Sequence, residues 1–339
     1  MSKIRILSID GGGIRGIIPG TILQIIEEKI QVYTGDPEAR LVDFVDFIAG
    51  TSTGAIIGCG MLAPSSRDPG RPQYQLKEIV DWYHQKGGEI FNKPFLHKLK
   101  SLWGVLDEKY PNTALKASLK EQFGDALMSG LLKPCLVTAY EIEVRKSMFI
   151  TQHNAAISPD ANFLVRDAVL ASCSAPTYFE AIKVPSLTEE DHVLIDGGVF
   201  ANNPAMCAYA EVRKLTFGDI INPTSEDMLL VSLGTGFVNE GYPYKKAKNF
   251  GFINWIRPLI SILMSGNAEI VSYQLKWLFD AGLQPESFIR IEPDLLHAKV
   301  DLDDASTINM NALREAALNY VAKNEALIDA IVVKLVKNP

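Results

Sequence analysis

A serine between two glycines is the residue of this chain best placed to act as a nucleophile. Residues 50–54 read Gly-Thr-Ser-Thr-Gly, so Ser52 is flanked by Gly50 and Gly54. In a nucleophile elbow, this spacing lets a sharp turn between a strand and a helix push the serine outward, because the glycines relieve the crowding. The alternative interpretation is a plain helix N-cap, a position that serine and threonine also favour. The segment therefore predicts acyl-transfer chemistry, with a structural cap as the alternative.

Three consecutive glycines near the start of the chain could stabilise the oxyanion that such a nucleophile generates. Gly11, Gly12 and Gly13 have no side chains, so their backbone N–H groups can point at one oxygen atom. The segment 11–16 also fits G-x-G-x-x-G, the pattern of dinucleotide sites, but such sites expect an acidic residue at the end of the second strand. Here the second expected strand leads into Ser52 instead, which disfavours a dinucleotide. A tight structural turn is the third interpretation.

A serine hydroxyl needs a base, because it is a weak nucleophile near neutral pH. Five histidines are available, and none lies in a recognisable motif: His84, His97, His153, His192 and His297. His297 alone follows Asp196, so it alone could complete a triad in the order Ser, Asp, His. Asp196 ends an apolar strand and precedes Gly197 and Gly198, so its carboxylate could serve as the base directly. We predict a Ser52–Asp196 dyad, with a Ser52–Asp196–His297 triad and a plain Asp-Gly turn as alternatives.

Short apolar runs alternate with helical patterns along the chain, and these elements must position the site. They predict strands joined by crossover helices, and hence an α/β fold with a mostly parallel sheet. The expected strands cover residues 4–9, 44–48, 135–139, 147–151, 193–196, 229–233 and 288–291. The expected helices cover residues 14–26, 55–62, 163–172, 204–215, 269–282 and 312–335. Residues 64–130 and 237–267 fit this core less well, and we expect insertions there that cap a site.

The composition is that of a folded globular protein, with 47% hydrophobic and 22% charged residues among 339. A net charge of −7 disfavours a protein that coats nucleic acid, so no nucleic-acid polymer is expected as a partner. The four cysteines are scattered and form no CxxC pair, which predicts a reduced compartment and no zinc site. No secretory signal is recognisable, and the uncharged run 47–66 carries the serine motif, so a cytoplasmic chain without a membrane span is expected.

Taken together, the motifs resemble those of the patatin-like phospholipase family. The matching blocks are DGGGIRG at 10–16, GTSTG at 50–54, ASCSAPTYF at 171–179, DGG at 196–198 and LVSLGTG at 230–236. The resemblance implies a catalytic core over residues 3–240, with a cap-like insertion over about 64–130. The C-terminal part, residues 241–339, is expected to pack on the same domain, and the segment 288–292 extends the resemblance into it.

The resemblance also implies a fold and an activity. The fold is a three-layer α/β/α sandwich with a mostly parallel central sheet, and the site is a Ser52–Asp196 dyad with an oxyanion hole on residues 11–13. Arg15, which follows this loop, either supports it or binds a phosphate, and Pro176 is expected near the site. The implied reaction is hydrolysis of fatty-acyl esters in membrane phospholipids, of phospholipase A or lysophospholipase type, without metal or cofactor. A non-catalytic lipid-binding protein of the same fold is an alternative.

Two segments outside the motifs could contact a membrane or a regulator. A helix over residues 95–106 has an apolar stripe flanked by lysines, which predicts transient membrane-surface contact, although core packing gives the same pattern. Residues 242–252 combine lysines with aromatic residues, as in a solvated loop or a site for a phosphate-bearing ligand. Some bacterial proteins that resemble this chain are phospholipases activated by cyclic nucleotides in antiphage defence, so a cyclic-nucleotide activator is a further expectation.

Overall fold

The computed structural model describes residues 3–91, 110–237 and 241–337. Its strands are β1 (Ile4–Ile9), β2 (Phe47–Gly50), β3 (Cys135–Glu141), β4 (Lys146–Thr151), β5 (Ile182–Pro185), β6 (Asp191–Asp196), β7 (Met228–Leu233) and β8 (Phe288–Ile291). Within the described residues they form an eight-stranded sheet in the order β5-β6-β3-β2-β1-β7-β8, with β4 also paired to β3. The strands from β3 through β2, β1 and β7 to β8 are parallel, whereas β4, β5 and β6 pair antiparallel. The sheet is therefore parallel where it carries the glycine loop and the serine motif.

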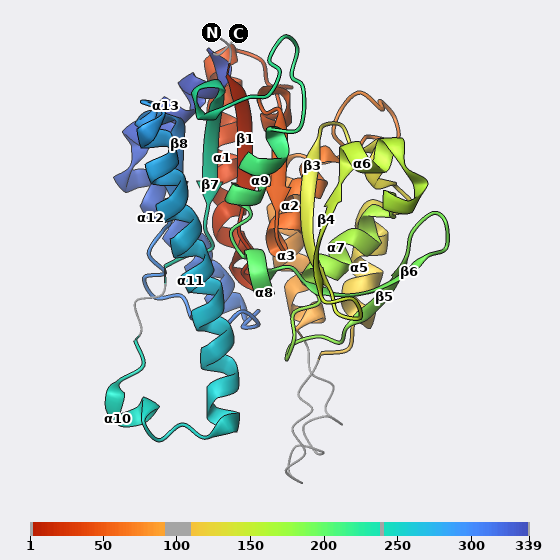
Figure 1. The fold of residues 1–339 in the computed structure, drawn as a ribbon. Coiled ribbons are helices and arrows are strands. Elements are labelled where there is room, and N and C mark those ends of the chain that lie inside the picture. The colour runs from red at the N-terminus through yellow and green to blue at the C-terminus, as the bar shows by residue number, and fades with distance from the viewer. Residues whose placement is uncertain (1–2, 92–109, 238–240, 338–339) are drawn as a thin grey trace.

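Helices cover both faces of this sheet, so the molecule has three layers (Figure 1). One layer contains α1 (Ile17–Thr34), α2 (Thr53–Leu62), α3 (Leu76–Ile90), α5 (Thr113–Phe123), α7 (Val165–Cys173), α12 (Thr307–Lys323) and α13 (Glu325–Val336). The other layer contains α8 (Gly198–Ala201), α9 (Ala205–Val212) and α11 (Phe252–Ala281). Because side chains alternate along a strand, Leu7 and Ile9 of β1 enter one core and Ile6 enters the other. The predicted α/β/α fold is confirmed.

The second strand begins three residues later than the predicted range 44–48. Residues Leu41–Phe44 form a 3₁₀ helix, which Asp43 caps by accepting a hydrogen bond from the Arg40 N–H at 2.9 Å. This hydrogen bond favours the 3₁₀ helix over a strand, because the Arg40 N–H is bound to a side chain and not to a neighbouring strand. The short strand β5 was not predicted, because only Ile182 and Val184 of its four residues are buried. The smaller element α6 (Gln152–Ile157) follows β4, and α10 (Tyr244–Ala247) precedes α11.

The long helix α11 differs most from the prediction, since it begins at residue 252 rather than 269. Its first half contains Pro258 and leaves large apolar side chains exposed, among them Trp255 and Leu259, so the sequence there does not follow the pattern of a helix that buries one face. The single helix predicted over residues 312–335 is two helices, α12 and α13, which separate at Asn324. No helix in the described residues has both the length and the hydropathy needed to cross a bilayer.

The expected insertion at 64–130 and the C-terminal part from residue 271 on contribute to the same two cores, whereas no described residue of 237–267 does. In the stretch 64–130, the described helices α3 and α5 pack on α1 and α7. The predicted membrane-binding helix at 95–106 lies outside the described residues. Near the end of the chain, β8 pairs with β7, and α12 and α13 pack on α1, so that both termini lie at one end of the molecule (Figure 1). The division into a core, a cap and a C-terminal part stays a prediction.

Candidate active site

Ser52 lies in the sharp turn between β2 and α2. Its backbone has φ 54° and ψ −119°, a conformation that costs a residue with a side chain about 1–3 kcal/mol. The backbones on either side approach so closely that a Cβ atom on Gly54 would overlap the Ile9 carbonyl, and one on Gly50 would overlap the Gly54 backbone. The Ser52 side chain makes no capping hydrogen bond to the helix. The turn therefore has the geometry of a nucleophile elbow and not that of a plain helix N-cap.

Asp196 is the last residue of β6, and its carboxylate lies close enough to the Ser52 hydroxyl for the hydroxyl to lower its pKa. The carboxylate accepts a hydrogen bond from the Gly198 N–H at 2.6 Å. Burial raises the pKa of Asp196 to about 7, although the Gly198 N–H and the Ser52 hydroxyl act in the opposite direction. Ser52 and Asp196, which are 8% and 5% exposed, line one cavity of about 90 Å³, named here the catalytic pocket. A carboxylate with this pKa can accept the proton of the hydroxyl near neutral pH.

The glycine loop borders the same pocket with two of its three predicted oxyanion-hole residues. Gly12 and Gly13 line the catalytic pocket, and among the described residues their N–H groups have no hydrogen-bond acceptor. Gly13 has φ +57°, and a Cβ atom there would overlap the Leu302 carbonyl oxygen, so the position favours glycine. Gly11 differs, because its N–H donates to the Asn202 carbonyl at 3.0 Å. In this arrangement Gly12 and Gly13 have amides that can face an oxyanion, whereas Gly11 anchors the loop.

Residues from the far end of the chain hold the glycine loop in place. Arg290 donates to both carboxylate oxygens of Asp10, at 3.0 and 2.6 Å, and also pairs with Glu292. Burial lowers the pKa of Arg290, but the neighbouring carboxylates of Asp10 and Glu292 outweigh burial and raise it. The Ile14 N–H donates to the Leu302 carbonyl at 2.9 Å. The loop is thus fixed before any substrate arrives, as electrostatic stabilisation of an oxyanion requires.

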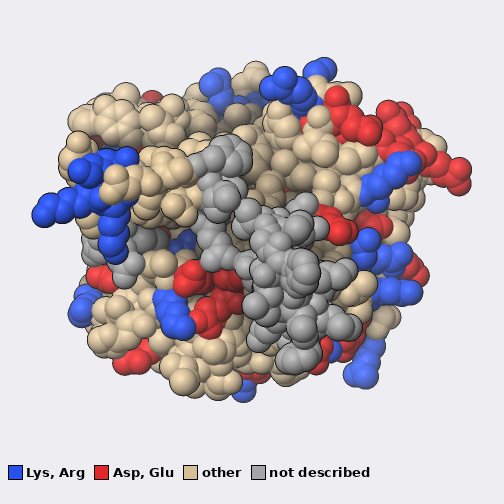
Figure 2. Space-filling model, turned by 90° about the horizontal axis from the view of Figure 1, so that it is seen from below, with Lys and Arg blue, Asp and Glu red and all other residues tan. Residues whose placement is uncertain are grey.

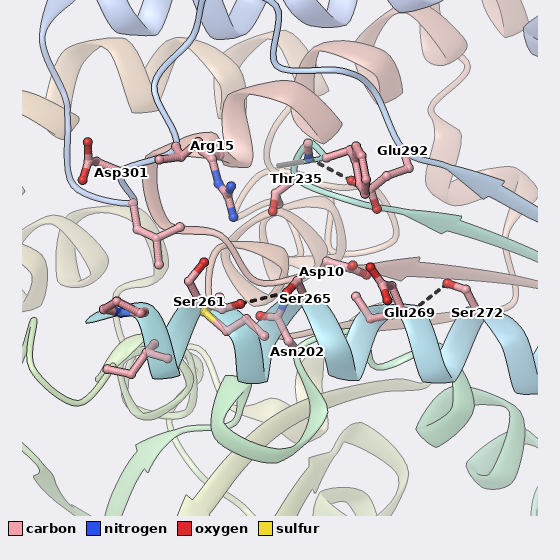
Figure 3. A pocket seen from close by; sticks show the side chains of 18 of the residues that line it. Asp10, Arg15, Asn202, Thr235, Ser261, Ser265, Glu269, Ser272, Glu292 and Asp301 are labelled. Atoms are coloured by element: carbon pink, nitrogen blue, oxygen red, sulfur yellow. Dashed lines mark hydrogen bonds between the residues drawn. The ribbon is translucent and has the colours of Figure 1, made fainter. Parts of the chain in front are cut away.

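The other predicted supporting residues lie close to this constellation but have different surroundings. Arg15 is 7% exposed and lines a second, larger cavity beside the catalytic pocket (Figure 3). Gly197 packs so closely on Thr138 that a side chain at this position would overlap it, and Gly198 supplies the N–H that binds Asp196. Pro176, expected near the site, lines the catalytic pocket.

Several residues of the site were missed by the sequence analysis. The Ser172 hydroxyl accepts the Ser52 N–H at 2.8 Å, and Asn202 binds the Gly11 backbone. Both residues lie in or just after matched blocks, so their polar character within apolar segments was an available signal. Ile260, Leu263 and Met264 of α11 also line the catalytic pocket. No sequence pattern connects them to Ser52, because only the folded chain brings α11 to the pocket.

No histidine in the described part of the chain lines the catalytic pocket. His153 Nε2 is hydrogen-bonded to Glu211 Oε1 at 2.9 Å, and His192 Nδ1 lies 3.3 Å from Glu141 Oε2. His297 is exposed in a turn after β8 and does not line the pocket. The geometry therefore favours the dyad over the triad that His297 would complete.

Replacing His297 with alanine is expected to leave kcat for ester hydrolysis within about twofold of wild type, as for most exposed side chains. Steady-state kinetics on a soluble p-nitrophenyl ester would measure this, with His84→Ala as a second histidine control. A loss of about a hundredfold or more would instead support a triad.

Comparisons with known proteins identify the family of this chain. A model of the patatin-like phospholipase family matches residues 7–209. Patatin-like protein 4 from Arabidopsis thaliana is 30% identical, over 98% of this chain and 85% of its own length. The protein named probable inactive patatin-3-Kuras 1, from Solanum tuberosum, is 29% identical over 95% of this chain and 87% of its own. A crystal structure of VipD from Legionella pneumophila matches 95% of this chain and 67% of its own, with a TM-score of 0.38 and 12% identity.

The chain is an α/β protein with a strand-turn-helix serine beside a buried carboxylate. It belongs to the patatin-like phospholipase family, a family of lipid acyl hydrolases. Because one relative is named inactive, membership alone does not establish catalysis in this chain. Catalysis by this chain therefore has to be inferred from its own site residues, Ser52 and Asp196.

Proposed function

We propose that this chain is a serine lipid acyl hydrolase that cleaves fatty-acyl esters of membrane phospholipids with a Ser52–Asp196 dyad. The observation that carries the proposal is that Ser52, in its strand-to-helix turn, lines one pocket together with the buried carboxylate of Asp196, whose pKa burial raises to about 7. Gly12 and Gly13 border the same pocket, where their amides can stabilise an oxyanion. The activity is of phospholipase A or lysophospholipase type.

The proposed reaction has two steps that use the same groups. Ser52 attacks the ester carbonyl while Asp196 accepts its proton, and the tetrahedral oxyanion faces the amides of Gly12 and Gly13. Collapse of this intermediate breaks the ester bond, and the protonated Asp196 returns the proton to the departing lysolipid alcohol. A water molecule, deprotonated by Asp196, then attacks the acyl-serine. As the ester bond breaks and the fatty acid leaves, Asp196 returns the proton to the Ser52 oxygen. Asp196 thereby alternates between base and acid.

Apolar side chains around Ser52 support an acyl chain as the group that is bound. A further cavity of about 50 Å³ reaches Ser52 from the side of α2 and α3. Its lining is mostly apolar and includes Ile56, Trp82, Phe91, Leu115 and Phe179. Burial of apolar methylene groups against such side chains contributes about 0.8 kcal/mol each. This favours a fatty-acyl ester over a small polar ester.

Product analysis tests the proposed activity directly. Mixed phospholipid vesicles incubated with the protein should yield free fatty acid and lysophospholipid, measured by mass spectrometry of the extracted lipids. A fluorophosphonate probe should label the protein, and peptide mapping should locate the label on Ser52. Products without labelling of Ser52 would contradict the dyad. Lipid binding without products and without labelling would favour the non-catalytic alternative.

The pH dependence of kcat/KM is expected to report Asp196. Only the deprotonated carboxylate can act as base, so activity should rise with pH through a midpoint near 7, the pKa to which burial raises this group. A pH series on a soluble p-nitrophenyl ester measures the midpoint. His297→Ala should show the same curve, which excludes this histidine as the titrating group. A midpoint near 4, the ordinary value for a carboxyl group, would contradict the assignment.

Membrane contact is proposed for the first half of α11 and the loop before it, because large apolar side chains are exposed there. Trp255, Leu259, Ile262 and Leu263 follow one helical face and are 39%, 50%, 43% and 51% exposed. Leu263 also lines the catalytic pocket, so this face continues into the site where a lipid would react. Figure 1 shows α10 and the start of α11 extending beyond the body of the molecule.

Positive charge adjoins this apolar face. Exposed lysines lie in and just after α10: Lys245, Lys246 and Lys248. The ring centroids of Phe250 and Trp255 are 5.2 Å apart, so this loop packs against α11. Seen from below in Figure 2, much of the described surface is uncharged, and Lys and Arg side chains gather at its left margin, the side of α10 in Figure 1. Lysines beside exposed aromatic and apolar side chains favour a membrane surface with anionic lipids.

A Leu259→Asp/Ile262→Asp variant is expected to lower binding to phosphatidylglycerol-containing vesicles by about tenfold or more, because two apolar side chains would no longer enter the lipid. Neither residue lines the catalytic pocket, so hydrolysis of a soluble ester should be unchanged. Vesicle sedimentation measures binding, and Ile308→Asp, at a position 84% exposed in α12, is the matched control. Equal binding of the variant and wild type would exclude this surface.

Two further expectations rest on the resemblance or on composition alone. Activation by a cyclic nucleotide in antiphage defence can be tested by calorimetry against a panel of cyclic nucleotides, and the absence of heat would count against it. A cytoplasmic location belongs to the same proposal, and cell fractionation tests it.

A further inference from the structure

A larger polar cavity adjoins the catalytic pocket and has no role in the proposed reaction. We call it the polar chamber: it has a volume of about 540 Å³ and lies between the glycine loop and the α11 helix. Figure 3 shows Arg15 pointing into it from the loop, opposite Ser261 and Ser265 of α11. Its lining shares Tyr178, Ile260, Met264 and Leu302 with the catalytic pocket. A molecule bound at Ser52 could therefore extend into the chamber.

Arg15 makes the chamber a site for an anion. The residue is only 7% exposed, and its Nε–H has no hydrogen-bond partner among the described residues. Burial lowers the pKa of Arg15, and the charges of Glu292, Tyr178, Asp10 and Asp301 oppose this effect, but arginine keeps its proton in proteins. A buried cation without an ion pair is costly. Asn202, another residue of the lining, has its Oδ1 buried without a donor among the described residues. The chamber therefore offers Arg15 as a cationic donor that has no ion pair in the described part of the chain.

Carboxylates line the rest of the chamber. Asp10 and Glu292 are paired with Arg290, so their charges are largely satisfied within the protein. Glu269 and Asp301 are exposed and have no ion pair in the described part of the chain. These two positions would favour a positively charged group on a ligand. Arg15 and the two exposed carboxylates thus fit a ligand that carries both signs of charge.

We propose that the polar chamber binds the headgroup of a zwitterionic phospholipid, with the phosphate at Arg15 and the ammonium group at one of the two rim carboxylates, Glu269 or Asp301, which lie on opposite sides of Arg15 (Figure 3). This inference rests on the proposed hydrolase function, and it adds a preference among its substrates. The acyl ester lies at Ser52 and the headgroup reaches past Tyr178, Met264 and Leu302 into the chamber. A headgroup without a positive charge could pair its phosphate with Arg15, but it would have no ammonium group to pair with the rim carboxylates.

The same charges bear on the expected cyclic-nucleotide activator. The chamber is lined by four carboxylates, those of Asp10, Glu269, Glu292 and Asp301, and by the guanidinium groups of Arg15 and Arg290. A cyclic dinucleotide would bring two phosphate charges into this excess of negative charge, which disfavours it here. The chamber therefore fits a zwitterion better than a dianion.

Short-chain phospholipids test the headgroup preference without interference from membrane binding. Dihexanoyl phosphatidylcholine and dihexanoyl phosphatidylglycerol, both below their micelle concentrations, should differ in kcat/KM in favour of the zwitterion. The Glu269→Gln/Asp301→Asn variant removes both candidate partners and should lower this ratio about fivefold, as expected for one solvent-accessible charge pair. Glu190→Gln/Asp219→Asn makes the same change in net charge at exposed positions outside the chamber, and should leave the ratio unchanged.

Hydrolysis of p-nitrophenyl butyrate, which has no headgroup, separates this inference from the proposed function. It should be the same in wild type and in the chamber variant. If wild type hydrolyses this ester but shows no preference between the two lipids, the inference is overturned and the hydrolase stands. If wild type hydrolyses none of the three esters, the proposed function itself fails, and the inference fails with it.

Binding to the Ser52→Ala protein gives a readout that is independent of turnover. Calorimetry should detect dihexanoyl phosphatidylcholine, with an affinity at least about fivefold lower in the chamber variant. Glycerophosphocholine carries the same charges without acyl chains, and it should bind more weakly than the lipid because the catalytic pocket stays empty. Tighter binding of glycerophosphocholine than of the lipid would overturn the headgroup assignment in favour of a free phosphodiester.

Discussion

Ser52→Ala is expected to lower kcat for phospholipid hydrolysis by about 10⁴-fold or more, as for nucleophilic serines in other hydrolases. The variant has no hydroxyl that can attack the ester, whereas the glycine loop and Asp196 are unchanged. Loss of the hydroxyl also removes a polar neighbour that lowers the pKa of Asp196, without filling or emptying a large volume. The protein should therefore fold normally and still bind lipid.

The measurement is release of fatty acid from vesicles, followed together with labelling by the fluorophosphonate probe. Ser66→Ala is the matched control, because Ser66 is exposed and lies outside the catalytic pocket. It should retain full activity and labelling. Activity of Ser52→Ala equal to that of wild type would remove the nucleophile assignment and with it the dyad.

Asp196→Asn should lower kcat by a comparable factor, about 10⁴-fold, because an amide cannot accept the serine proton. The substitution preserves shape, and the amide oxygen can still accept the Gly198 N–H bond that now measures 2.6 Å. Pre-steady-state labelling with the fluorophosphonate probe should slow as well, since the same base activates Ser52 for both reactions. Labelling at the wild-type rate would argue that another group activates the serine.

The stability of this variant distinguishes loss of the base from loss of the fold. Burial raises the pKa of Asp196 from 3.8 to about 7, so the native state holds this proton more tightly than the unfolded chain does. Stability from this group is therefore present below about pH 4 and is lost as pH rises through 7. Above pH 7 the neutral asparagine avoids the cost of a buried charge, and the variant should unfold at a temperature no lower than wild type. If Asp196→Asn melted at a lower temperature than wild type at pH 8, unfolding and not loss of the base would explain its inactivity.

The sequence predicted the parallel centre of the sheet and the positions of Ser52 and Asp196 at the ends of strands, because both depend on local patterns. The apolar run before Asp10 and the glycines around Ser52 specify a strand and a turn within a few residues. The strand before Asp196 was equally recognisable, and the end of β6 brings that carboxylate to Ser52. Motif order along the chain was therefore enough to identify the groups that the fold unites.

The rest of the site depends on tertiary contacts that leave no periodic signal. The hydrogen bond from the Gly11 N–H to Asn202 could not be predicted, because nothing local specifies which backbone carbonyl lies opposite the loop. The first half of α11 was assigned to a cap-like insertion and not to a helix, since its exposed apolar residues do not follow the pattern of a helix packed on a core. The polar chamber was missed for the same reason, as α11 forms one of its walls.

The contacts between the glycine loop and the end of the chain have a consequence for synthesis on the ribosome. Asp10 binds Arg290, and Ile14 binds the Leu302 carbonyl, across separations of 280 and 288 residues. Domains emerge N-terminus first, so the nascent chain carries Ser52 and Asp196 long before residues 290–302 leave the exit tunnel. Until then the amides of the loop lack the partners that orient them. The proposed lipid hydrolysis would then mature only after residues 290–302 have emerged, which would protect the membranes of the cell from unfinished chains.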